Sequence, residues 1–362
     1  MRQFTRLVAR AASGVYRAPQ SFRMTTSATW RSLAQSLIGE PELTAAEVAT
    51  QAGVDLEQAR HLWRALGFPP VSDENRVFTR SDLAVLLGIR RLLAEQATAP
   101  DVLIQLTRVI GQSLARVAEA QIAATADHLD ASQLVDPAVV DATAERIRSL
   151  VPTLEPFLGY VWRRHLLAAL LRFVGGADSP SSAGRTLVVG FADLVGFTAI
   201  SQQLSERELA AMVDRFEARA YEHIPERGGR VVKMIGDEVM FAVDDVGAAA
   251  QIALGLVEAY AGDAALPEVR VGLAWGPALS WEGDLFGPVV NLASRLVNIA
   301  RPGSVLVAED LGQQLQADAA FTLIHLRPLE IKGIGRVRFW VLRRLASGSP
   351  EISPPPRRRL RR

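Results

Sequence analysis

Two aspartates occupy positions from which carboxylates could bind a metal ion. Asp193 follows a short apolar segment with the pattern of a buried strand, and Asp237 lies in the turn of a predicted hairpin, residues 230–243. Carboxylates on neighbouring strand ends suit Mg²⁺, which takes one or two of them and completes its octahedron with phosphate and water oxygens. Taken singly, each aspartate fits a solvated loop residue better. The pair alone therefore leaves both interpretations open.

A third segment, residues 283–295, carries an amide and a guanidinium one helical turn apart. Asn291 and Arg295 project from the same face of a predicted helix. Their apolar neighbours Val290, Leu292 and Ala293 indicate that the start of this helix packs into the body. The two polar side chains could form a cap and a salt bridge. They could equally orient a sugar oxygen and stabilise a phosphoryl transition state.

Five ordered sequence blocks resemble the catalytic domain of the class III nucleotide cyclases, the family that includes bacterial and mammalian adenylate cyclases. The blocks span roughly residues 186–345 and read FADLVGFT, KMIGDEVMF, VRVGLAWGP, GDLFGPVVNLASR and LEIKGIG. The resemblance implies an adenylate cyclase of the actinobacterial type, with an N-terminal helical autoregulatory domain. Such an enzyme converts ATP to 3′,5′-cyclic AMP and pyrophosphate.

The resemblance also implies a role for each matching residue. Asp193 and Asp237 match the ligands of two Mg²⁺ or Mn²⁺ ions per site, with the Leu194 carbonyl as a further ligand. Asn291 matches the ribose-orienting asparagine, and Arg295 matches the arginine that stabilises the transition state. One metal would lower the pKa of the ribose 3′-hydroxyl for attack on the α-phosphate, and the other would hold the β- and γ-phosphates.

Three further residues match substrate-binding positions of the family. Lys332 matches the lysine that binds the triphosphate, and Lys233 with Asp284 matches the pair that reads the adenine edge. An ammonium can donate to adenine N1, and a carboxylate can accept from the N6 amine. Guanine presents a donor and an acceptor in the opposite places, so the pair favours ATP. A guanylate cyclase or a cyclase of relaxed specificity is the enzymatic alternative.

The resemblance implies a homodimer. Family members build each site from the metal ligands of one chain and the Lys, Asp, Asn and Arg of the other. This chain carries both sets once, so two equivalent sites are expected. Only six residues separate Pro277 from Asp284, a segment shorter than the dimerisation arm of many relatives. We therefore expect the N-terminal domain to contribute to the dimer.

The elements that must position these residues follow from the pattern after residue 184. Strands are predicted at 187–191, 230–234, 238–243, 269–275 and 304–308, helices at 206–226, 246–260 and 289–300, and a closing hairpin at 321–345. This βαββαβ order with extra strands predicts an α+β, ferredoxin-like catalytic domain at residues 185–346. An all-α regulatory domain is predicted to precede it at residues 30–174.

Turn and cap residues divide the N-terminal half into helices. Thr44 begins a capping box, Gly53 and Gly67 end two short helices, and Thr79 begins a third. Longer helices are predicted at 100–130 and 156–174. A pH signal, sensed by a histidine such as His165, and a fatty acyl ligand near residues 166–174 both stay open as inputs.

The short helices resemble a winged or MerR-like helix-turn-helix. Its second helix offers Gln58, Arg60, His61 and Arg64, few side chains for reading DNA. We therefore expect a packing unit and no nucleic-acid partner. The alternative is a transcriptional regulator that uses this motif, with the cyclase domain as a nucleotide sensor.

Charge is distributed unevenly along the 362 residues. The chain has 40 basic and 39 acidic residues, but residues 1–39 hold six arginines and no acid, and residues 357–362 hold five more arginines. The remaining body carries 29 basic and 39 acidic residues, which is a poor general surface for nucleic acid. The absence of cysteine excludes disulfides and thiolate metal sites.

The flanking segments complete the predicted organisation. Residues 1–29 are expected to be a basic, disordered extension, residues 175–184 a linker and residues 347–362 a basic, disordered tail. The extension is interpreted either as an over-extended gene start before Met24 or as a basic segment that contacts lipid. Arginines interrupt the longest apolar stretch, 157–174, so we expect no membrane span and a cytoplasmic location.

Overall fold

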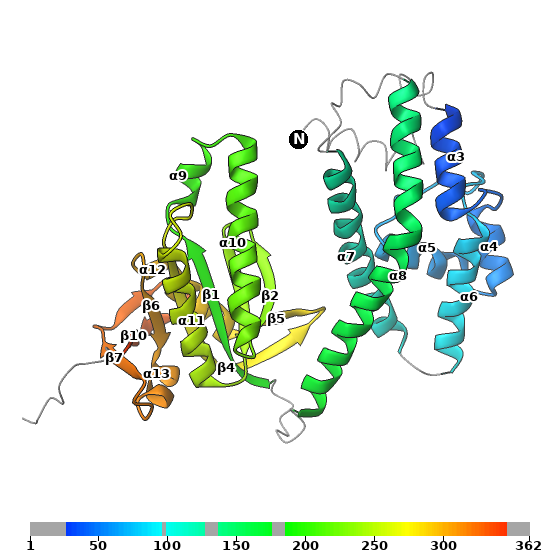
Figure 1. The fold of residues 1–362 in the computed structure, drawn as a ribbon. Coiled ribbons are helices and arrows are strands. Elements are labelled where there is room, and N and C mark those ends of the chain that lie inside the picture. Colours follow the sequence, from blue (N-terminus) through cyan, green and yellow to red (C-terminus); the bar gives the residue numbers. More distant parts are fainter. Residues whose placement is uncertain (1–26, 96–98, 127–136, 176–184, 346–362) are drawn as a thin grey trace, which may run out of the picture. The chain divides into compact units, whose positions relative to one another are not determined.

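The computed structural model describes residues 27–95, 99–126, 137–175 and 185–345. The chain divides into two units, Met1–Gly175 and Gly176–Arg362 (Figure 1). The sequence pattern changes at the same place, from helices alone to strands alternating with helices, between the last helix of the first unit and the first strand of the second.

Helices make up the first unit over the described residues, apart from one isolated bridge between Leu43 and Phe78. The first helix begins inside the segment expected to be an extension. The helices are α3 Ser27–Ile38, α4 Ala45–Ala52, α5 Leu56–Ala65, α6 Arg80–Ala94, α7 Pro100–Ala126 and α8 Pro137–Gly175. Trp63 and Phe78 stack with ring centroids 4.3 Å apart in the core shared by α4, α5 and α6.

The predicted caps of this unit are confirmed. Thr44 accepts a hydrogen bond from the Glu47 amide at 3.2 Å, and the Glu47 carboxylate accepts from the Thr44 amide at 2.7 Å. Thr79 begins α6 with a second capping box, closed by Asp82. Gly53 ends α4 in the left-handed conformation, with φ 67°, which is favourable for a residue without a Cβ.

The candidate DNA-reading helix, α5, has little free positive charge. Arg60 forms an ion pair with Glu57 on its own helix and a second one with Asp73 at 2.5 Å. The Nε of Arg64 donates to the Arg60 carbonyl, and its NH2 lies 3.8 Å from Glu57. Arginines neutralised in this way are poorly suited to phosphate contacts. These contacts agree with a packing unit.

The last helix of the unit corrects one expectation. A helix was predicted from about residue 156, but α8 begins at Pro137 and continues through Pro152 and Pro156. Each proline removes one backbone donor and costs helix stability. The helix nevertheless continues over 39 residues, and α3 packs against it.

The second unit contains an eight-stranded sheet and a separate two-stranded one. The strands are β1 Arg185–Leu194, β2 Arg230–Ile235, β3 Glu238–Val243, β4 Val269–Trp281, β5 Asp284–Phe286, β6 Val305–Ala308, β7 Phe321–His325, β8 Leu329–Ile331, β9 Gly335–Val337 and β10 Phe339–Arg344. The order in the large sheet is β2-β3-β1-β4-β6-β10-β7, with β5 paired to β4. Only the β4–β6 pairing is parallel among the described strands.

This topology confirms the α+β, ferredoxin-like prediction. The helices are α9 Phe197–Ser201, α10 Glu206–Glu226, α11 Val246–Ala261, α12 Pro288–Ile299 and α13 Glu309–Leu315. The chain runs β1-α10-β2-β3-α11-β4, which is the βαββαβ order, and these four strands are arranged β4-β1-β3-β2. The predicted closing hairpin is wrong in detail, because β8 and β9 form a hairpin of their own between β7 and β10.

Both faces of the central strand are buried, so β1 lies at the centre of the unit. Val188, Ala192 and Leu194 join one core with residues of α10 and α11. The alternating residues Val189 and Phe191 join a second core with residues of α12. Figure 1 shows α10 and α11 lying side by side across one face of the sheet. The end of β1 is thereby held between two cores.

None of the helices within the described residues has both the length and the apolar character needed to cross a bilayer.

Candidate active site

The three predicted metal-binding residues meet at the end of β1. Asp193 and Leu194 are the last two residues of β1, and Asp237 lies in the turn between β2 and β3. The Leu194 amide donates to the Asp237 carbonyl over 3.1 Å, which fixes the turn against the strand. Gly236, with φ 65°, supplies the left-handed residue of this tight turn.

An arginine that the sequence reasoning missed holds Asp193. In the strand register, Arg270 of β4 lies opposite Asp193. Its Nε and NH2 groups both lie 2.7 Å from Asp193 Oδ2, and its NH1 group donates to the Asn298 carbonyl of α12 over 3.0 Å. In the sequence, Arg270 is visible as a cation near the start of the VRVGLAWGP block, but only the strand register identifies Asp193 as its partner.

Negative charge is crowded at this end of the sheet. Burial raises the pKa of Asp193, the Arg270 hydrogen bond and charge oppose that rise, and Asp237 adds to it. Glu238, in register with Asp193, was also missed, and burial followed by the charges of Asp193 and Asp237 raises its pKa to about 7. A bound cation would relieve this repulsion.

The donor set at this end fits Mg²⁺ or Mn²⁺ bound largely by substrate and water. Two carboxylates and a carbonyl are the protein oxygens that Mg²⁺ accepts alongside phosphate oxygens. Over the part of the chain that the structure describes, no group of three or more His, Cys, Asp or Glu side chains is arranged to hold a metal on its own. Ligands from a substrate would therefore have to complete the coordination.

The two residues expected to read the purine form an ion pair with each other. Lys233 lies on β2 beside a register shift, and its Nζ is bonded to Oδ2 of Asp284 at the start of β5. The Leu285 amide donates to the other oxygen of Asp284 over 2.8 Å. Both side chains are partly exposed, at 40% for Lys233 and 27% for Asp284. The pair is thus oriented and accessible.

Asn291 and Arg295 lie on one face of α12, as predicted, and both are exposed. Gly287 caps the helix with φ 136°, Pro288 is its first residue, and Val289 and Ala293 are buried. Within the described residues, the side chains of Asn291 and Arg295 form no hydrogen bond or ion pair, so the cap-and-salt-bridge interpretation is not observed. Both groups can meet a ligand.

Lys332 belongs to a hairpin that forms a two-stranded sheet of its own. It lies in the exposed turn of the β8–β9 hairpin, between Ile331 and Gly333, where Gly333 has φ 83°. This hairpin is outside the main sheet. In the described chain, no hydrogen bond or ion pair of Lys332 links it to the end of β1 or to α12.

Comparison with known proteins identifies both halves of the chain. Residues 181–344 match the family model described as the adenylate and guanylate cyclase catalytic domain, and residues 15–173 match the adenylate cyclase regulatory domain. An adenylate cyclase of Glutamicibacter nicotianae is 37% identical over 91% of this chain and 86% of its own length. The chain belongs to the adenylate cyclase family.

Two further relatives of this adenylate cyclase show the same two-part match. An adenylate cyclase of Streptomyces coelicolor is 36% identical over 86% of this chain and 88% of its own length. A protein of Mycobacterium tuberculosis named as a pH-sensitive adenylate cyclase is 32% identical over 84% of this chain and 79% of its own length. At this coverage, each alignment includes parts of both the regulatory and the catalytic regions.

Proposed function

We propose that this adenylate cyclase converts ATP to 3′,5′-cyclic AMP and pyrophosphate at sites shared by two copies of the chain. The observation that carries the choice of ATP is the Lys233–Asp284 pair, in which a donor and an acceptor are held side by side. In the free protein each group satisfies the other. Adenine can replace these contacts by accepting at N1 from the ammonium and donating its N6 amine to the carboxylate, whereas guanine cannot.

Asp193, Asp237 and the Leu194 carbonyl would hold two Mg²⁺ or Mn²⁺ ions. When bound, these ions supply the positive charge that makes the 3′-hydroxyl more acidic and neutralises the triphosphate. Support for this assignment comes from the crowded carboxylates at the end of β1 and from the raised pKa of Asp193. Arg270 adds a guanidinium beside the same carboxylates.

The remaining residues bind and orient the nucleotide. Asn291 would position the ribose, and Arg295 would stabilise the charge that develops on the α-phosphate in the transition state. Lys332 would hold the β- and γ-phosphates. These three side chains are exposed and form no hydrogen bond or ion pair within the described residues, which leaves them available to substrate.

We also propose that each site is shared by two copies of the chain. Within the described residues, no hydrogen bond or ion pair links Asn291 or Arg295 to Asp193 or Asp237, and a head-to-tail homodimer would bring the two sets together across the interface. We take residues 30–174 as the regulatory domain, 175–184 as the linker and 185–346 as the catalytic domain. We also propose a cytoplasmic location. The pH-sensitive name of one relative supports pH as an input.

One assay tests the proposed function. The full chain is incubated with ATP or GTP, each with Mg²⁺ or Mn²⁺, and the cyclic nucleotides are quantified by chromatography. We expect cyclic AMP from ATP with either metal, and little cyclic GMP. Preferential formation of cyclic GMP, or no cyclic nucleotide under any condition from pH 5 to 8, would contradict the proposal.

A further inference from the structure

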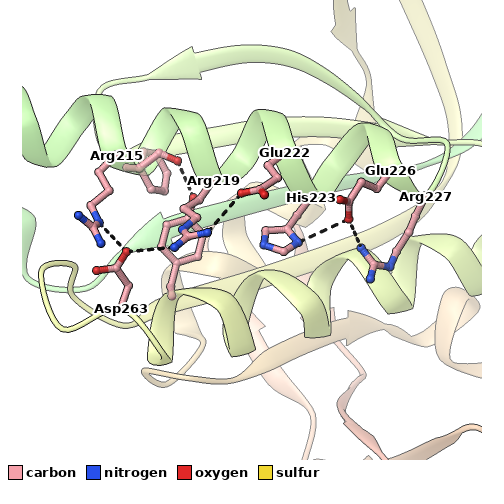
Figure 2. Close-up of polar contacts among 9 residues, drawn as sticks. Arg215, Arg219, Glu222, His223, Glu226, Arg227 and Asp263 are labelled. Carbon is pink, nitrogen blue, oxygen red and sulfur yellow. Dashed lines mark hydrogen bonds and ion pairs between the residues drawn. The ribbon is translucent and has the colours of Figure 1, made fainter.

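A buried carboxylate lies away from the proposed catalytic groups. Among the described residues, Asp263 is the only charged residue in the buried class, with a side chain 2% exposed. Arg215 Nε donates to Asp263 Oδ2 over 2.5 Å, and Arg219 NH2 lies 3.7 Å from the same oxygen (Figure 2). The Ala265 amide donates to the other oxygen over 3.1 Å. Both oxygens are therefore engaged.

The two arginines come from one helix and the aspartate from the loop after another. Arg215 and Arg219 are four residues apart on α10, so they share a face. Asp263 belongs to the loop of residues 262–268, which joins α11 to β4. Beside it, the Tyr260 hydroxyl donates to the Phe216 carbonyl of α10 over 2.6 Å. The loop is thus tied to α10 at its first residues.

The other end of this loop contacts the end of β1. The Val195 amide, directly after Leu194, donates to the Glu268 carbonyl over 2.9 Å. The next two residues, Val269 and Arg270, pair with Leu194 and Asp193 in the strand register. The position of the loop therefore sets where the Glu268 carbonyl and the Arg270 guanidinium meet the proposed metal ligands.

We propose that Asp263 is a positioning residue for the metal site, and that its clamp by Arg215 and Arg219 holds the loop that orients the end of β1. The inference rests on the proposed function for the assignment of Asp193 and Asp237 as metal ligands. Apolar packing often stabilises a fold as well as a buried ion pair does, and the best-attested role of such a pair is to specify one register. A directional contact is suited to a loop that must orient catalytic ligands.

Two variants test the clamp and one serves as a matched control. Asp263→Asn removes the charge and keeps the shape, and Arg215→Gln removes the nearer donor from an exposed position. The control is Glu258→Gln. Glu258 lies on α11, the helix that precedes the loop, and forms an ion pair with Arg344 of β10 at N–O distances of 2.5 and 3.2 Å. The substitution breaks an ion pair that does not involve the loop. If Asp263→Asn fails to fold, Arg215→Gln still tests the proposal.

The first readout is amide hydrogen exchange of the full chain, which needs no metal. The clamp variants should exchange faster than wild type in peptides covering residues 191–200, where the Val195 amide bonds to Glu268. Glu258→Gln should leave these peptides at the wild-type rate. Unchanged protection of residues 191–200 in both clamp variants would overturn the proposal, whatever happens to the thermal stability.

The second readout is the affinity for the Mn²⁺ complex of a non-hydrolysable ATP analogue, measured by calorimetry, with Asp193→Ala as the reference. Asp263→Asn should weaken binding roughly tenfold, the order found for residues that orient metal ligands. Glu258→Gln should bind as wild type does. If Asp193→Ala loses binding while both clamp variants keep it, the inference is wrong. If Asp193→Ala itself binds normally, the proposed metal site is wrong.

Discussion

In the free protein, the Lys233 ammonium donates a hydrogen bond to the Asp284 carboxylate. A base that binds to this pair must break this hydrogen bond and form one new hydrogen bond with the ammonium and another with the carboxylate. The cost of separating two charged groups is recovered only by a base with an acceptor beside a donor, in the same spacing. Under the proposed function, selectivity at this position would depend on the geometry of one ammonium and one carboxylate, and not on charge alone.

Lys233→Arg is therefore expected to damage ATP recognition although it keeps the positive charge. The planar guanidinium is larger and presents its donors in a fixed fork, so it cannot place a single donor at adenine N1. Loss of a hydrogen bond to a charged group corresponds to roughly a ten- to hundredfold fall in kcat/KM for ATP. Steady-state kinetics measure this, and wild-type kinetics in the variant would remove Lys233 from the purine site.

Asp263 is expected to give the catalytic unit an acid-sensitive contribution to stability. The Arg215 hydrogen bond lowers the pKa of this carboxyl from its ordinary value of 3.8. The contribution is complete above the unfolded-state pKa and is lost as the pH falls through the lower folded-state pKa, because the unfolded chain then binds the extra proton. The difference in unfolding free energy between wild type and Asp263→Asn should shrink below about pH 4. Urea titrations from pH 3 to 7 measure it, and a constant difference would be contrary to this prediction.

The sequence was informative about residues that belong to motifs and silent about their supporting partners. Asp193, Asp237, Lys233 and Asp284 could be named because their types and order match a family pattern. Arg270 and Glu238 acquire their roles only through the register of β1 with its two neighbours. Asp263 lies 48 residues from Arg215. No local pattern predicts a contact of that separation.

At the scale of elements, the packing of α12 against β4 depends on one glycine. A Cβ at Gly272 would lie 2.6 Å from the Ala293 carbonyl oxygen and closer still to the Val297 amide, both in the backbone of α12. Since backbone cannot rotate away as a side chain can, α12 would have to move. Asn291 and Arg295 would move with it.

Gly272→Ala is consequently expected to destabilise the catalytic unit and to lower kcat. Overpacking of this kind typically costs about 1–3 kcal/mol. Gly276→Ala on the same strand is the matched control, because its Cβ would meet Val289 at an ordinary 3.6 Å. Thermal unfolding and cyclase kinetics of both variants test the prediction. Equal behaviour of the two would show that this close approach is unimportant.

The elements themselves were predicted well where local chemistry marks their ends. The range 206–226 for α10 is confirmed, and Ser205 begins the helix with a capping box. The start of α8 was missed because Pro152 and Pro156 resemble helix boundaries, yet both lie inside the helix. The β8–β9 hairpin was missed because three-residue strands carry too little alternation to detect.

For the whole molecule, the proposed shared site predicts complementation between inactive chains. Asp193→Ala lacks a metal ligand, and Asn291→Ala lacks the ribose contact, so each homodimer should be inactive. Half of the dimers in an equal mixture that exchanges subunits are mixed, and each mixed dimer has one intact site of two. About a quarter of the wild-type rate should return. Co-expression followed by a cyclic AMP assay tests this, and a mixture as inactive as its parents would contradict a shared site.

The two lysines have a consequence for chemical labelling. The chain has 38 arginines but only Lys233 and Lys332 as side-chain amines. Lys332 projects from an exposed hairpin turn, whereas Nζ of Lys233 is bonded to Asp284. A limiting amount of an acylating reagent should therefore modify Lys332 first, and ATP should shield both. Mass spectrometry of two tryptic peptides would then report nucleotide occupancy in the intact protein without any enzymatic turnover.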